Sequence, residues 1–216
     1  MANFRTVFEY GEAVDIINKS RFIGYIKPIE TVQEATAFIE EIKKKHWDAS
    51  HNVPVYVLGD KFQVQKYSDD GEPSGTAGVP ILNMLKNEGI TNVVIVVTRY
   101  FGGIKLGTGG LVRAYTQSAK SALKEAKVIE QIEHKLYSLK MDYSLHGKIQ
   151  NFLMNNPEYL VKDTVFMNDV EIFLYVKLED ESGMISKFVD LSNDQIEMKE
   201  LEEAILSVSS EGEWLK

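Results

Sequence analysis

The pattern of apolar and polar positions predicts strands alternating with helices over the first 130 residues. Extended segments are expected near the start, at residues 6–10 and 20–29. A helix should follow, because Thr31 and Glu34 form a capping-box pair ahead of apolar residues at helical spacing, which are Ala35, Phe38, Ile39 and Ile42. Its end is basic, at residues 43–46, as suits the negative end of a helix dipole.

The next part of the chain predicts a hairpin, a short helix, a buried strand and a long helix. Residues 53–58 and 62–67 are expected to pair through a turn at Gly59 and Asp60, and Pro80 lies at the start of the short helix. Residues 93–97 form an unbroken β-branched run, typical of a strand buried on both faces. The long helix, from about 108 to 126, has one side of small residues that can lie close to a sheet, namely Ala114, Ser118, Ala119, Ala122 and Ala126.

The second part of the chain predicts the order β-α-β-β-α-β. Strands are expected from Tyr137, over 159–167, from Val170 after a turn at Asn168, and over 196–208. Two amphipathic helices separate them, marked by Leu145, Ile149, Phe152 and Leu153 and by Met184, Ile185, Phe188 and Val189. This order is the ferredoxin-like plan, which hosts many functions and by itself says little about activity.

The two parts also differ in charge and in glycine content. Residues 1–134 contain 12 of the 15 glycines and 16 Lys and Arg against 16 Asp and Glu. Residues 135–216 contain 8 against 16, so they carry the whole net charge of −8. We therefore expect an α+β protein of two domains, 1–130 and 135–216. Neither has the strongly basic balance of a nucleic-acid binder that relies on bulk charge, although a local basic patch in the first stays open.

Composition excludes several classes of protein. With 44% hydrophobic and 26% charged residues the chain is ordinary for a globular protein. It contains no cysteine, which excludes disulfide frameworks, thiolate zinc sites, iron–sulfur clusters and cysteine nucleophiles. No apolar stretch is long enough to span a membrane and no secretory signal is recognisable, so a cytoplasmic protein is expected, without membrane partner, metal or cofactor.

A glycine-rich segment between the buried strand and the long helix is the first candidate site. Arg99, Lys105 and Arg113 lie around five glycines, which are Gly102, Gly103, Gly107, Gly109 and Gly110. Exposed amides, a helix start and three cations make a sensible cradle for phosphate, sulfate or RNA. The segment matches neither a Walker A loop nor G-x-G-x-x-G, and the glycines could instead serve close packing and positive φ angles.

Residues 68–80 are the second candidate. Their three carboxylates, at Asp69, Asp70 and Glu72, lack the spacing of a calcium loop and suit an ordinary tight turn. The amides of residues 74–78 lie near a helix start, where they could bind an anion. We expect the wall facing the glycine-rich segment to comprise His51, Asp70, Glu72, Ser74 and Thr76. A triad of Ser74, His51 and an aspartate lacks the nucleophile elbow, so no catalytic residue is assigned.

Three stretches of this sequence closely resemble the IMPACT family, including its bacterial YigZ-like members of two domains. They are KSRFIGYI, DDGEPSGTAGVP and VVIVVTRYFGGIKLGTGGLVRAY, which lie in order between residues 19 and 115. The resemblance implies a first domain of the ribosomal-protein and GHMP-kinase type and a second similar to the last domain of elongation factor G. Eukaryotic relatives add an RWD domain and restrain a translation-control kinase pathway by competing for its activator.

These observations together predict a translation-associated regulatory or binding protein. It would contact RNA, the ribosome or a translation factor through the glycine-rich cleft of the first domain. One alternative is an enzyme acting on a phosphorylated or peptide-like small molecule in the same cleft, which needs a titratable group among others in a pocket. Another is a pure protein-interaction module, which needs an exposed apolar patch.

Overall fold

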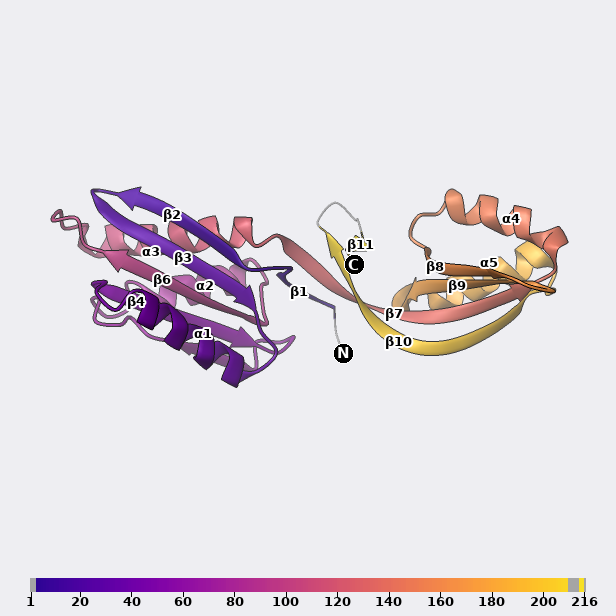
Figure 1. Ribbon diagram of the computed structural model, residues 1–216, viewed down its shortest axis with the longest axis horizontal. Coiled ribbons are helices and arrows are strands. Elements are labelled where there is room, and N and C mark those ends of the chain that lie inside the picture. The colour runs from indigo at the N-terminus through magenta and orange to yellow at the C-terminus, as the bar shows by residue number, and fades with distance from the viewer. Residues whose placement is uncertain (1–2, 210–213, 216) are drawn as a thin grey trace. The chain divides into compact units, whose positions relative to one another are not determined.

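Figure 1 shows the fold in a computed structural model, which describes residues 3–209 and 214–215. Close contacts divide the chain into two compact units. The first is Met1–Gln131 with Ser207–Lys216, and the second is Ile132–Leu206. The sequence assigned all of residues 135–216 to the second domain, whereas the contacts group the described residues from Ser207 onward with the first unit. Each unit is described by itself.

The first unit is built on a five-stranded antiparallel sheet. The strands stand in the order β2-β3-β6-β4-β5, with the bounds Gly11–Ile17, Ser20–Pro28, Val93–Tyr100, His51–Leu58 and Val64–Tyr67. Strand β1 (Phe4–Val7) lies outside this sheet, because it pairs with the start of β7 (Val128–Met141). The strand pair β4 and β5 is the predicted hairpin.

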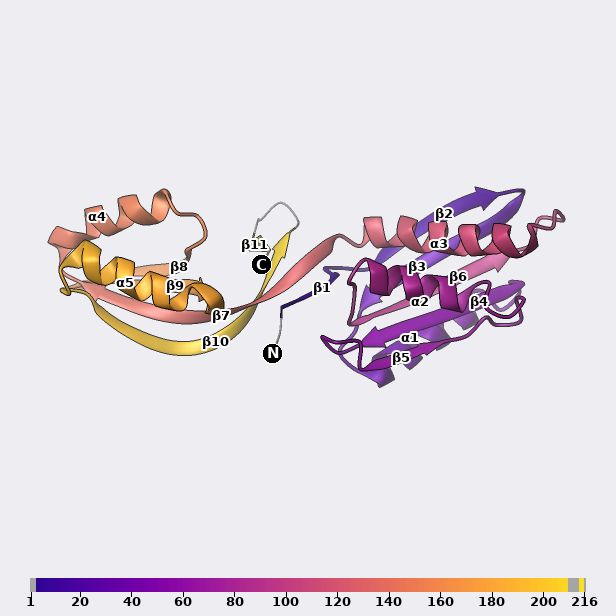
Figure 2. The ribbon, with the colours of Figure 1, turned by 180° about the vertical axis from the view of Figure 1, so that it is seen from behind.

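Helices cover both faces of this sheet. Helix α1 (Val32–Lys45) lies on one face, and α2 (Gly78–Asn87) and α3 (Gly107–Glu125) lie on the other (Figures 1 and 2). The central strand β6 is buried on both faces, as its β-branched run predicted, because side chains of a strand alternate between two sides. Val94 and Val96 belong to the core under α1, and Val93, Ile95 and Val97 to the core under α2 and α3.

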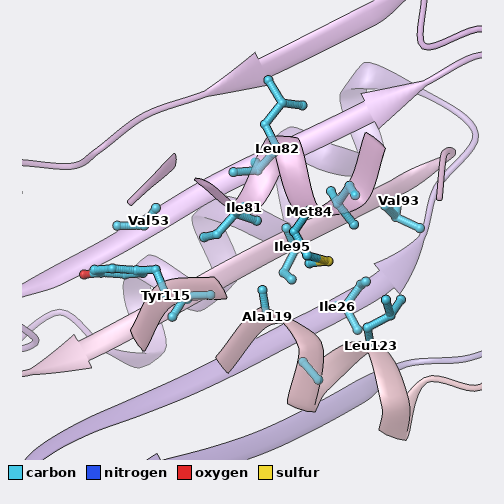
Figure 3. Packing of buried hydrophobic residues seen from close by; sticks show 14 of the residues in the cluster. Ile26, Val53, Ile81, Leu82, Met84, Val93, Ile95, Tyr115, Ala119 and Leu123 are labelled. Atoms are coloured by element: carbon cyan, nitrogen blue, oxygen red, sulfur yellow. The ribbon is translucent and has the colours of Figure 1, made fainter. Parts of the chain in front are cut away.

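The small-residue side of α3 lies directly against the sheet, as predicted. A Cβ atom built on Gly24 of β3 would lie 2.5 Å from the carbonyl oxygen of Ser118 and 3.0 Å from the Cβ of Ala122. Only glycine therefore permits this approach. Figure 3 shows the core that fills the remaining space, with Ile81, Leu82 and Met84 of α2, Tyr115, Ala119 and Leu123 of α3, and Ile26, Val53, Val93 and Ile95 of the sheet.

The predicted start of α1 is confirmed in detail. The Thr31 hydroxyl accepts a hydrogen bond from the Glu34 amide at 3.2 Å, and the Glu34 carboxylate accepts one from the Glu30 amide at 3.1 Å. Two groups of the chain that would otherwise lack partners are satisfied in this way. The helix buries Ala35, Phe38 and Ile42 against the sheet.

The second unit has the predicted β-α-β-β-α-β order. Its elements are β7, α4 (Tyr143–Met154), β8 (Leu160–Phe166), β9 (Val170–Lys177), the short η1 (Leu178–Asp180), α5 (Glu181–Ser192) and β10 (Glu197–Ser209). The strands stand in the order β10-β7-β9-β8. Leu139, Ile149, Val170 and Phe188 lie in its core and are fully buried. The prediction of two α+β domains is thus confirmed.

Two strands differ from the prediction. Strand β2 was not expected, and β7 begins at Val128, nine residues before the expected start at Tyr137. At the other end of the chain, β11 (Trp214–Leu215) pairs with Ser207 and Val208 of β10. Among the described residues no helix is both long and apolar enough to cross a membrane.

Candidate functional site

Both candidate segments lie at one end of the sheet of the first unit, which we call the loop end. It comprises residues 18–19 of the β2–β3 turn, 46–50 after α1, 68–77 before α2 and 101–106 after β6, which form the loops at the left of Figure 1. Contacts join these loops. Ser50 accepts a hydrogen bond from the Phe101 amide at 3.1 Å, and a Cβ on Gly102 would meet the carbonyl group of Lys19 at 2.0 Å.

A buried ion pair lies at the centre of the loop end. Arg99, the penultimate residue of β6, donates through Nη1 to Oε1 of Glu72 at 2.6 Å and through Nη2 to the Ser20 hydroxyl at 3.4 Å. The Arg99 and Glu72 side chains are only 6% and 4% exposed. The guanidinium carbon also lies 5.4 Å from the ring centroids of both Phe22 and Phe101. The charge of Arg99 is therefore balanced within the protein.

Tyr115 and His51 complete this cluster. The Tyr115 hydroxyl donates to Oε1 of Glu72 at 2.8 Å, and burial together with this carboxylate raises its pKa far above the ordinary value. Nδ1 of His51 lies 2.7 Å from the carbonyl oxygen of Asp70. Because a carbonyl only accepts, this nitrogen donates the hydrogen bond, and Nε2 lies 3.7 Å from Oε1 of Glu72. His51 thus lies between the acidic turn and the pair of Glu72 with Arg99.

The amides before α2 bind a carboxylate of the chain itself. Asp69 accepts hydrogen bonds from the amides of Gly75 at 2.8 Å, Ala77 at 3.1 Å and Gly78 at 2.8 Å. Burial by itself would raise the pKa of Asp69, but these three bonds outweigh it and lower the pKa below its ordinary value. The anion that the sequence predicted for this helix start is therefore Asp69, and an external anion would have to displace it.

The remaining residues of the predicted wall have separate environments. Asp70 accepts from the Asn52 amide at 2.7 Å and pairs with Lys43 at 3.3 Å. Thr76 is buried, and its hydroxyl donates to the Pro73 carbonyl at 2.6 Å. Ser74 is exposed. The wall thus brings His51, Asp70 and Glu72 together with Arg99, while Ser74 and Thr76 lie in the turn that Asp69 closes.

The glycine-rich segment has unbonded amides ahead of α3. Among the hydrogen bonds between described residues, none has an amide of residues 103–106 as its donor, and α3 begins without a side-chain cap for the amides of its first turn. Gly103 and Gly107 have positive φ angles of 83° and 70°, with open space where a Cβ would lie. The Gly102 amide is bonded to the Ser20 hydroxyl at 3.2 Å. Geometry thus explains Gly102, Gly103 and Gly107, and leaves the helix start open to solvent.

Lys105 and Arg113 flank this open helix start. Both are exposed, and neither has an ion pair with a described residue. A Cβ on Gly109 would lie 3.7 Å from Nη1 of Arg113, so the guanidinium lies beside the first turn of α3. Arg113 also lines a shallow groove of about 680 Å³ on the outer side of α3, together with Val112, Thr116, Gln117, Lys120, Ser121 and Lys124.

The structure adds residues that the sequence did not single out for the site. Ser20, Asn52 and Tyr115 bond to candidate residues, and Asp69 binds the amides at the start of α2. Asp69 stands directly beside Asp70 in the acidic turn, so its sequence position was a usable signal, whereas Ser20 and Tyr115 reach Arg99 and Glu72 from distant parts of the chain. Within residues 3–209 and 214–215, no group of three His, Asp or Glu side chains is arranged to hold a metal ion.

The chain is an α+β protein of two domains, and the first domain has a helix that begins in a glycine-rich segment. Comparison with known proteins identifies the family. Residues 18–123 match the Impact N-terminal domain, and residues 139–195 match a domain of unknown function, DUF1949. IMPACT family member YvyE of Bacillus subtilis is 42% identical over 198 residues, which are 92% of this chain and 91% of that protein. The chain belongs to the IMPACT family.

The similarity extends over both domains in other relatives. IMPACT family member YigZ of Escherichia coli is 33% identical over 196 residues, which are 88% of this chain and 94% of that protein. A solved structure entitled "Crystal structure of an hypothetical protein" matches with a TM-score of 0.58 and 30% identity, covering 94% of this chain and 98% of the other. The predicted resemblance to the two-domain bacterial members is confirmed.

Proposed function

We propose that this chain is a translation-associated regulatory protein that binds RNA through the loop end of its first unit. Membership of the IMPACT family supports a role in translation at the level of the family. The observation that carries RNA binding is the pair of exposed cations, Lys105 and Arg113, beside unbonded amides at the start of α3. Phosphate oxygens accept hydrogen bonds from such amides and are attracted by both the cations and the helix dipole.

Arg99 has a different role in this proposal from the one its sequence position suggested. The sequence proposed Arg99, Lys105 and Arg113 as three equivalent anion contacts. Since Glu72 already neutralises the buried Arg99, we assign direct phosphate contact to Lys105 and Arg113. Arg99 instead stabilises the structure of the loop end. Removing one member of a buried pair usually destabilises a protein by about 3–5 kcal/mol, so an Arg99 variant would test folding rather than binding.

The test is therefore the double variant Lys105→Ala with Arg113→Ala. Its affinity for an RNA oligonucleotide should fall at low salt, while the far-UV circular dichroism and thermal midpoint stay unchanged. Because two phosphate contacts are lost, the slope of log affinity against log salt should become shallower by about 1.4–1.8. Lys61→Ala with Lys86→Ala is the matched control, since both lysines are exposed and lie toward the other end of the sheet.

Two results would contradict the proposal. Equal RNA affinity of the folded double variant and the parent would remove Lys105 and Arg113 from any binding surface. No measurable RNA binding by the parent at low salt would exclude RNA as the ligand and favour a protein-interaction module.

An enzyme acting on a small molecule remains the second candidate, and the partly exposed His51 beside Glu72 is the observation that favours it.

A further inference from the structure

Trp47 is the most exposed large apolar side chain among the described residues. It lies in the turn between α1 and β4, separated by His46 from the three lysines at residues 43–45, and is 83% exposed. Burying a tryptophan contributes strongly to stability. It is therefore unusual that so large a ring is exposed to water in a turn whose backbone is fixed by hydrogen bonds. A ring in this position contributes little to the folded state and is available to a partner.

The turn that carries Trp47 is fixed by its neighbours on both sides. The Ala49 amide donates to the carbonyl of His46 at 3.1 Å, and the Ser50 amide donates to the carbonyl of Arg99 at 2.9 Å. The buried His46 ring lies between two hydroxyl groups, with Nε2 at 2.6 Å from Tyr25 and Nδ1 at 2.8 Å from Tyr100. Trp47 therefore lies in a turn whose backbone is fixed by hydrogen bonds on both sides.

Phe101 provides a second exposed ring at the same corner. It is 49% exposed, and its amide donates to the hydroxyl of Ser50, three residues after Trp47. The Arg99 guanidinium lies against this ring, and Glu72 holds the guanidinium in turn. One side of the Phe101 ring is thus fixed by a cation–π contact while nearly half of its surface stays open.

Several cations lie near these rings, together with one carboxylate, Asp48, which accepts a hydrogen bond from the Tyr100 hydroxyl. Lys44 is exposed and has no ion pair with a described residue, and Lys105 lies four residues beyond Phe101. Lys45 lies 4.6 Å from the Tyr25 ring centroid and 3.7 Å from Glu12, in a loose and exposed pair of little strength. Exposed aromatic rings among unpaired cations are the combination that binds bases and phosphates of a single strand.

We infer that the loop end binds unpaired RNA, with bases stacked on Trp47 and Phe101 and phosphates contacted by Lys44, Lys105 and Arg113. This inference rests on the proposed function and adds the form of RNA that is bound. A double helix hides the faces of its bases within the stack, so it would meet the cations but neither ring. Single strands should therefore bind more tightly than duplexes of the same length.

The experiment uses the full chain with Trp214→Phe, so that Trp47 is the single tryptophan. Binding of a single-stranded oligoadenylate should quench the Trp47 fluorescence, and the duplex with oligouridylate should bind more weakly. Trp47→Ala in the otherwise unchanged chain, followed by fluorescence anisotropy of labelled RNA, should weaken single-strand binding about tenfold. Trp47→Phe, which keeps a ring, should restore most of the affinity, and Phe166→Ala should have no effect, since that ring is 57% exposed but belongs to the second unit.

The outcomes separate this inference from the proposed function. RNA binding that depends on Lys105 and Arg113 but is equal for single and double strands, and equal in Trp47→Ala, would overturn the inference and leave RNA binding standing. Absence of RNA binding by the parent would overturn both. A blue shift of Trp47 emission on adding anionic phospholipid vesicles, with no change on adding RNA, would assign the surface to a membrane and overturn the inference.

Discussion

The acidic residues of the loop end show how single side chains take roles that their type does not reveal. Three carboxylates within four residues suggested the wall of a binding cleft. Each of them has a partner within the chain, since Asp69 binds three amides, Asp70 binds the Asn52 amide and Glu72 binds Arg99. The first could be suspected from its position before a helix. The pairing of Glu72 with Arg99, 27 residues apart, depends on how the loop packs against β6 and cannot be seen in the sequence.

At this scale the first prediction concerns the stability that Asp69 provides. Asp69→Ala should lower the free energy of unfolding at pH 7 by about 1–3 kcal/mol, because three amides at the start of α2 lose their acceptor. Urea unfolding followed by circular dichroism measures this loss. Asp190→Ala is the control, since Asp190 is exposed and should change stability by less than about 0.5 kcal/mol.

The same substitution has a defined pH dependence. The folded-state pKa of Asp69 is depressed below 3.8, so the carboxylate stabilises the fold above its unfolded pKa and loses this effect as the pH falls through the folded pKa. The difference between Asp69→Ala and the parent should therefore be complete at pH 7 and shrink in acid below about pH 4. An equal difference at pH 7 and pH 3 would show that lost packing, rather than the charge, causes the effect.

Among the elements, the helices and the central strand could be predicted from their hydrophobic patterns, whereas strand β2 could not. The helices α1, α3, α4 and α5 and the strand β6 lie within a few residues of their predicted positions. Strand β2 was missed because its positions facing α3 include Gly11 and Ala13, which give little hydrophobic signal. These residues are small because α3 lies so close, as a Cβ on Gly11 would meet the Ala122 carbonyl oxygen at 2.5 Å. The feature that hides the strand in the sequence is thus the one that positions the helix.

A second prediction follows from this close approach of α3 to the sheet. Gly24→Ala should destabilise the first unit by about 1–3 kcal/mol, because the added methyl would lie 2.5 Å from backbone oxygen and force the helix outward. Gly147→Ala in α4 is a matched substitution in open space, where alanine should stabilise by about 0.5–1 kcal/mol. Thermal unfolding of both variants measures the two effects. A neutral Gly24→Ala would show that the gap between β3 and α3 can widen freely.

For the whole molecule, the net charge of the sequence does not reveal where the candidate site lies. The proposed RNA surface lies in the first unit, although residues 1–134 have no net charge, so binding there must come from local cations. Bulk composition could not locate this surface. Which cations are left without a carboxylate partner depends on the pairing of the neighbouring cations, and that pairing is set by the fold.

The last prediction concerns the independence of the two units. Each has its own core, with Ile81 fully buried in the first and Phe188 fully buried in the second. Phe188→Ala should lower the free energy of unfolding by about 3–5 kcal/mol, and Ile81→Ala should lower it by about 2–5 kcal/mol.

Both tryptophans, Trp47 and Trp214, belong to the first unit, so tryptophan fluorescence reports on that unit while circular dichroism reports on both. Phe188→Ala should therefore lower a transition seen by circular dichroism and leave the fluorescence midpoint and the RNA affinity unchanged, whereas Ile81→Ala should lower the fluorescence midpoint. Strands β7 and β10 contribute residues to both units and are the route by which the cores could be coupled. If Phe188→Ala lowers both midpoints by the same amount, these shared strands make the molecule unfold as one cooperative body.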